Sequence, residues 1–126
     1  MDDLMNFLLE NDIADISEEV IISKRVPMKF GIRPMTKNQH ADFIKRCRLR
    51  NGEFDDAKFQ TIVCLDCTEK PNFRDAQAIA KAGVITGEEL LTKTLLPGEI
   101  SALHAKICAL SGFDTDINED VEMAKN

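Results

Sequence analysis

The stretch covering residues 86–114 constrains the fold more than any other part of the chain, because it carries the signals for two helices and the corner between them. Thr86 and Glu89 form a capping-box pattern, in which each side chain satisfies a backbone N–H group at a helix start. We therefore predict a helix at about residues 87–96. Pro97 cannot continue that helix, but it suits the first turn of a new one, so the corner should lie there.

Apolar residues recur at helical spacing on both sides of this corner. The second helix carries Ile100, Leu103 and Ile107, and it should end at Gly112 because glycine commonly closes a helix. The leucines expected to face it from the first helix are Leu90, Leu91, Leu95 and Leu96. We expect these two helices to form a hairpin at the centre of the fold, with the rest of the chain packed around it.

Further helix signals are spread along the chain. Helices are predicted at about residues 2–10 and 37–50, and the second of these begins with the capping box of Thr36 and Gln39. Its expected apolar stripe is Ala41, Ile44 and Cys47, with Phe43 to one side. Three more helices are expected. They run from Asp55 to Pro71, from Asp75 to Gly83, and from Asp116 onward with Ile117, Val121 and Ala124 on one stripe.

Two segments near the N-terminus indicate strands. Residues 20–26 are rich in β-branched side chains, and residues 28–33 alternate between apolar and polar types. These strands should pair as a hairpin that turns around residues 24–27. A chain of 126 residues is the size of one domain. The predicted fold is therefore a single, mainly α domain of the α+β class over residues 1–126, with five to six helices and one N-terminal β-hairpin.

Residues 1–19 are expected to form a loosely attached N-terminal arm. Its helix has an apolar stripe of Leu4, Met5, Leu8 and Leu9, and an acidic connector follows at residues 11–19. Two interpretations remain open. The helix could dock onto a partner, or it could fold back on its own core, which is the commoner fate of such stripes.

Charge divides the chain into three parts. Residues 1–19 hold seven acids and no base, residues 20–50 hold nine bases and one acid, and residues 51–126 hold fourteen acids and seven bases. The basic part could close against the acidic parts or offer a positive face to a partner. A nucleic acid is the less favoured partner, because the isoelectric point is about 4.9 and the chain lacks the Tyr and Trp that stack on bases.

No catalytic constellation stands out in the sequence. Cys64 and Cys67 have the spacing of half a metal site, but they fall within a helical pattern and are expected to be buried as small hydrophobes. His40 and His104 have no neighbours that suggest a triad, and each glycine stands alone at a turn or cap. We expect no enzyme activity, no cofactor and no structural metal.

The sequence also gives expectations about location. The four cysteines are expected to be free thiols, because the acidic start of the chain is unlike a signal peptide. The apolar runs are too short to cross a bilayer, so no membrane association is expected and the protein should act in the cytoplasm.

The order of several short motifs resembles the XkdN-like family of phage tail-assembly chaperones, found in long-tailed phages and PBSX-type prophages. An acidic N-terminal helix precedes two segments, residues 22–25 and 30–36, and then a basic helix. After these come the motifs at residues 71–76, 83–91, 95–99 and 111–114. The resemblance covers nearly the whole chain, and it is the ordered set of motifs that is specific. Cys64 and Cys67 depart from the usual family pattern.

The resemblance implies a non-enzymatic chaperone that binds the tape-measure protein, keeps it soluble, and helps recruit tail-tube subunits before being lost from the finished tail. Some members are made in two lengths by a translational frameshift, and the ending of this chain would fit the shorter form. Self-association stays open. Competing interpretations are a generic protein-interaction module and a nucleic-acid binder that uses residues 20–50. The residues expected to contact partners are Leu4, Phe7, Leu8, Arg33, Arg46, Arg50 and Phe113.

Overall fold

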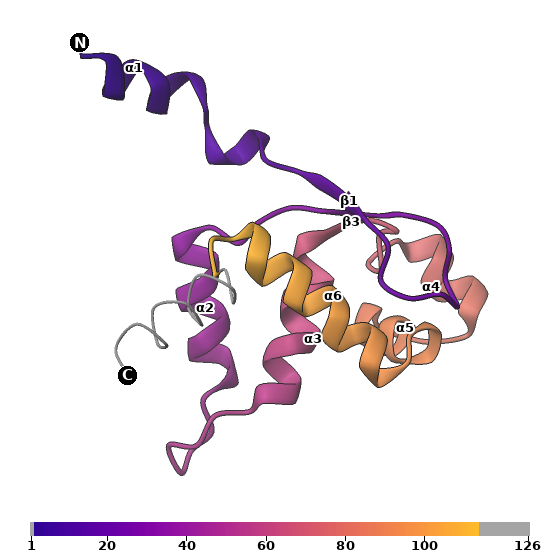
Figure 1. The fold of residues 1–126 in the computed structure, drawn as a ribbon. Helices are drawn as coiled ribbons and strands as arrows, with labels where there is room; N and C mark the ends of the chain where they lie inside the picture. Colours follow the sequence, from indigo (N-terminus) through magenta and orange to yellow (C-terminus); the bar gives the residue numbers. More distant parts are fainter. Residues whose placement is uncertain (1, 114–126) are drawn as a thin grey trace, which may run out of the picture.

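The structure is a computed structural model that describes residues 2–113 (Figure 1). Across these residues it contains six α-helices, one turn of 3-10 helix and three short strands. The helices are α1 (Asp3–Glu10), α2 (Lys37–Cys47), α3 (Asp56–Cys67), α4 (Ala76–Ala82), α5 (Gly87–Thr94) and α6 (Pro97–Leu110). The predicted mainly α, α+β fold is confirmed. The helix predicted after Asp116 lies outside the described residues.

The three strands form one antiparallel sheet. β1 (Glu18–Val20) pairs with β2 (Phe30–Ile32), and β3 (Thr68–Lys70) pairs with the other edge of β2. The predicted hairpin is therefore present, but the strand predicted over residues 20–26 is wrong beyond Val20. The chain leaves the sheet there because the Ser23 and Arg25 side chains donate hydrogen bonds to Glu99 of α6.

β3 falls where the sequence predicted a continuing helix. α3 ends at Cys67, and the next residue, Thr68, already has an extended backbone and pairs with Ile32 of β2. Two local preferences explain the change. Threonine is β-branched, and Lys70 precedes a proline, which disfavours the helical backbone at that position.

α3 is the centre of the helical part, which corrects the prediction that the hairpin of α5 and α6 holds this place. α6, α2 and α5 all pack against α3 (Figure 1), whereas α5 and α6 make few contacts with one another. The reason is that α3 is apolar around most of its circumference and must be covered on several sides. Its buried residues are Ile62, Val63, Cys64, Leu65 and Cys67.

The helix starts predicted at Thr36, Asp55, Asp75 and Thr86 are confirmed. The Thr36 and Gln39 side chains form the expected capping box of α2. The Asp55, Asp75 and Thr86 side chains each accept a backbone N–H from the first turn of α3, α4 and α5.

The end of α2 and its buried face differ from the prediction. α2 ends at Cys47 rather than at residue 50, because Arg48 becomes extended and forms an isolated antiparallel bridge with Phe54. The buried residues of α2 are Phe43 and Cys47, while Ala41 is exposed and Ile44 is half-buried. Of the predicted stripe only Cys47 is buried, and Phe43, predicted to lie to one side, is the other buried residue of α2.

Candidate functional site

α1 presents an apolar face that no other part of residues 2–113 covers. Exposed fractions are 67% for Leu4, 61% for Phe7 and 52% for Leu8, and Met5 and Leu9 are also exposed. No residue of α1 is buried. The helix lies away from the other helices, at the end of the segment that leads to β1 (Figure 1). The interpretation that it folds back on its own core is therefore wrong for this structure.

The polar residues of α1 explain why it forms and which face it leaves free. The Asp2 carboxylate accepts the backbone N–H of Met5 at 2.7 Å and so caps the helix. At 100° per residue, Asp3, Asn6 and Glu10 lie on the side opposite the apolar face. The connector carries its own capped 3-10 turn, in which Asp12 accepts from Ala14. The arm is thus an amphipathic acidic segment.

The three predicted arginines do not form one basic face. Arg33 lies beside β3, where its guanidinium donates to the backbone oxygen of Asp66 at 2.8 Å and lies 3.7 Å from the Glu69 carboxylate. Arg46 pairs with Asp42 on the same helix at 3.6 Å. Arg50 is exposed in the loop after α2. Two of the three charges are therefore compensated by nearby acids, which weakens the case for a nucleic-acid surface.

Phe113 lies at yet another place, just beyond α6. Its ring is half-exposed, and the ring centre lies 5.0 Å from that of His40 on α2. Its backbone N–H donates to the Cys108 oxygen at the end of α6. The residues predicted to contact partners thus fall into separate regions, and only Leu4, Phe7 and Leu8 share one surface.

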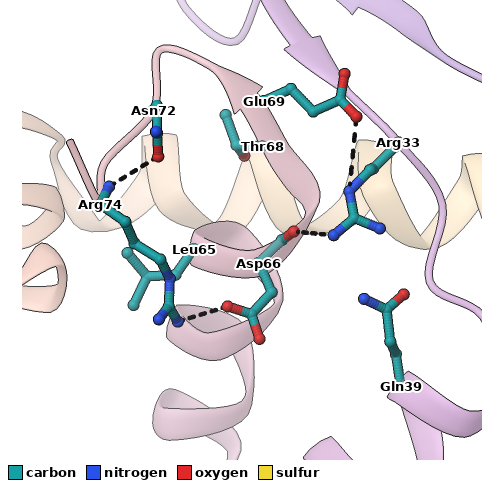
Figure 2. Close-up of a pocket in the computed structure, with 8 residues that line it drawn as sticks. All are labelled: Arg33, Gln39, Leu65, Asp66, Thr68, Glu69, Asn72 and Arg74. Carbon is teal, nitrogen blue, oxygen red and sulfur yellow. Dashed lines mark hydrogen bonds and ion pairs between the residues drawn. The ribbon is translucent and has the colours of Figure 1, made fainter.

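A polar pocket of about 450 Å³ lies where α3, β3 and the turn before α4 meet (Figure 2). The Arg33 and Arg74 guanidinium groups both point toward Asp66, Arg33 to its backbone oxygen and Arg74 to its carboxylate (Figure 2). With Glu69 beside Arg33, the pocket holds two positive and two negative side chains. Its charged side chains therefore compensate one another. The hydrogen bonds from Arg33 and Arg74 to Asp66 link the residue after β2 and the turn before α4 to the end of α3.

An apolar groove of about 460 Å³ was not foreseen from the sequence. The loop of residues 21–29, the turn at Pro71, and helices α4 and α5 surround it. Phe30, Phe73 and Leu90 are buried within its lining, while Met28 stands at the surface with 67% of its area exposed. The sequence gives no signal for this groove, because the pattern of residues 26–30 predicts parts of two strands.

The buried carboxylate of Glu99 was also missed as a key residue. It accepts from the Ser23 hydroxyl at 2.6 Å, from the Arg25 Nε at 2.9 Å, and from the backbone N–H of Leu96 at 2.8 Å. The Arg25 hydrogen bonds, followed by those from Ser23 and Leu96, lower the pKa of Glu99 from 4.5 to about 2. A glutamate three residues into a helix that begins at a proline is a capping signal that could have identified it.

The cysteines and histidines are arranged for packing. Burial raises the pKa of Cys64 to about 12 and that of Cys67 to about 11, so both thiols stay protonated. Burial also lowers the pKa of His104, which lies 3.4 Å from the Cys108 sulfur. Within residues 2–113, no group of three or more potential ligands is placed to hold a metal ion. No helix in the described part is long and apolar enough to span a membrane.

Comparisons with known proteins decide the family. The model of a protein family described as "Phage XkdN-like tail assembly chaperone protein" matches residues 4–125 of this chain. The chain belongs to this family. A crystal structure of the protein YqbN is similar in fold, with a TM-score of 0.71 and 22% sequence identity, covering 90% of this chain and 99% of that chain. A comparison with curated proteins finds no match. The XkdN-like family resemblance inferred from the motifs is confirmed.

Proposed function

We propose that this XkdN-like chaperone binds the tape-measure protein of its own phage, keeps it soluble, and helps to recruit tail-tube subunits. It would act in the host bacterial cytoplasm and be absent from the mature virion. The observation that carries the proposal is the uncovered apolar face of α1, where Leu4, Phe7 and Leu8 are more than half exposed. A surface of this kind on a soluble chain commonly marks a binding site.

The physical argument concerns the client. A tape-measure protein is a long helical chain that exposes apolar stripes to water until the tail tube covers them. Covering such stripes is favourable because apolar surface leaves water, and a short amphipathic helix is well shaped to do so. The seven acids of residues 1–19 keep the arm itself soluble. Arg33, Arg46 and Arg50 would tune the rate of association, because exposed charges are screened by salt.

The test is co-expression with the phage's own tape-measure protein. The wild-type chaperone should raise the soluble yield of that client, and the triple variant Leu4→Ser, Phe7→Ser, Leu8→Ser should abolish the effect. A matched control removes three exposed apolar residues elsewhere, by the changes Leu49→Ser, Ile85→Ser and Leu96→Ser. This control should solubilise the client as the wild type does.

Two results would count against the proposal at different levels. Full rescue by the α1 triple variant would remove α1 from the client-binding site. If the wild type fails to solubilise its own tape-measure protein, that protein is not its client. Far-UV circular dichroism of both triple variants should match the wild type closely, because the six substituted residues are all exposed.

A further inference from the structure

The apolar groove has the properties of a docking site for a helix. Its floor contains Phe30, Phe73, Leu90 and Leu95, all buried, and Met28 projects from its rim. Its volume of about 460 Å³ falls within the range of pockets that bind ligands or side chains. Such an apolar recess favours an occupant with several large apolar side chains on one face.

The charge at the groove selects the kind of occupant. Lys29 and Lys70 line it, both are exposed, and no acidic residue is among the lining residues. Neither lysine takes part in an ion pair within the described part of the chain. An apolar groove with a positive rim therefore fits an amphipathic helix that carries negative charge.

α1 has the complementary properties. It exposes Leu4, Phe7 and Leu8, and the segment from Asp2 to Glu10 contains three acids and no base. In the structure α1 lies on the far side of the molecule from α4 and α5, which border the groove (Figure 1). Among the residues that the structure describes, both surfaces are therefore uncovered within one copy, although each has the chemistry that the other needs.

We propose that α1 of one copy docks in the apolar groove of a second copy, and that two copies exchange their α1 helices reciprocally. A reciprocal exchange is closed, so it uses both grooves and stops at a dimer. The connector at residues 11–17 has no buried residue, so no core contact within it fixes the direction in which α1 points. Two dockings in one dimer reinforce each other through effective concentration.

The chain offers a direct reporter, because it contains no Trp. The reporter copy carries Met28→Trp at the groove rim, together with the α1 changes Leu4→Ser, Phe7→Ser and Leu8→Ser. It has a groove but no functional arm. Titration with the wild-type chain should shift its fluorescence to shorter wavelength in a saturable way, since the indole loses contact with water when another copy's α1 docks.

Two controls isolate the contact. The reporter should not respond to an unlabelled chain that carries the same three α1 substitutions. A second reporter with Leu49→Trp, in a loop outside the groove, should not respond to the wild type. An absent shift with wild-type protein would overturn the proposal. A Met28→Trp protein with an intact α1 gives a second check. If its emission lies at short wavelength at every protein concentration, α1 occupies the groove of its own copy, and the proposal is overturned.

Sedimentation velocity provides an independent measurement. The mass of the wild type should rise with concentration from 14.1 kDa toward twice that value, and it should not increase beyond a dimer. The double variant Lys29→Glu, Lys70→Glu should weaken the dimer at least tenfold, since it places acids opposite an acidic helix. A wild type that stays monomeric, or a charge-reversed variant that dimerises equally well, would overturn the exchange.

The α1 exchange and the proposed chaperone function can be tested separately. The variant Lys29→Glu, Lys70→Glu keeps α1 intact, so it should still solubilise the tape-measure protein while failing to dimerise. If the Lys29→Glu, Lys70→Glu variant, whose α1 is free, fails to solubilise the client while the wild type forms a normal dimer, the client is rejected and the exchange stands.

Discussion

Replacing Leu103 by alanine should test the assignment of α3 as the centre of the fold. Leu103 lies on α6 with its side chain fully buried, and α6 packs against α3. Removing a fully buried leucine side chain leaves a cavity as well as losing its transfer free energy, and such changes cost about 2–5 kcal/mol. Since domains of this kind have a total stability of about 5–15 kcal/mol, the variant should be folded but markedly weakened.

The matched control is Leu96→Ala, the same chemical change seven residues earlier, at an exposed position. Its effect on the free energy of unfolding should stay within about 0.5 kcal/mol. Urea denaturation followed by far-UV circular dichroism gives both values, with an unchanged slope in each case. A difference of less than about 1 kcal/mol between the two variants, well below the cavity cost expected for Leu103, would refute the packing of α6 on α3.

Two further predictions concern stability. The folded state lowers the pKa of Glu99 to about 2, so its ionised form stabilises the fold above pH 4.5, and this contribution is lost as the pH falls from 4.5 toward 2. Acid denaturation should therefore be steeper for the wild type than for Glu99→Gln in that window, and parallel curves would contradict the assignment. A methyl group at Gly87 would lie 2.7 Å from the backbone oxygen of Phe73, so Gly87→Ala should destabilise by about 1–3 kcal/mol. Gly98 has nothing within 4 Å, so Gly98→Ala in the first turn of α6 should be neutral or stabilising by up to about 1 kcal/mol in the same urea assay, and equal losses for both variants would refute the close approach.

Local signals predicted the helix starts correctly because they depend on residues close in sequence. The capping pair of Thr36 and Gln39, and the cap at Asp55, act within one turn of the backbone and so can be read without knowledge of the fold. The position of α3 could not be read in this way. Its central place depends on which surfaces meet, and an apolar circumference is compatible with several packing arrangements.

The sheet shows the same limit. Thr68 was assigned to a helix because the apolar pattern before it is helical, and its pairing partner Ile32 is far away in sequence. The early end of β1 depends on a distant residue as well, since Glu99 draws Ser23 and Arg25 toward α6. A contact between residues more than seventy positions apart leaves no local pattern.

The candidate site was predictable in part. The amphipathic pattern of α1 is visible in the sequence, but its exposure is not, because the same pattern serves a helix that folds back on the core. The basic residues 20–50 suggested a positive face, yet Arg25, Arg33 and Arg46 each have an acidic partner. The groove arises from four separate segments of the chain, so no single stretch carries a signal for it.

The shortness of α1 leads to a last prediction about its affinity. A helix of eight residues without tertiary contacts is only marginally stable in water, so docking must also order it, and this lowers the net affinity. Asn6 lies on the polar face, opposite the apolar side chains. Asn6→Ala should therefore strengthen docking without adding a contact, by about 0.5 kcal/mol of helix propensity for each α1, or about 1 kcal/mol and roughly fivefold in the dissociation constant of a dimer that docks two. Asn6→Gly should weaken it, and sedimentation velocity would measure both. Equal dissociation constants for the two variants would mean that α1 does not bind as a helix.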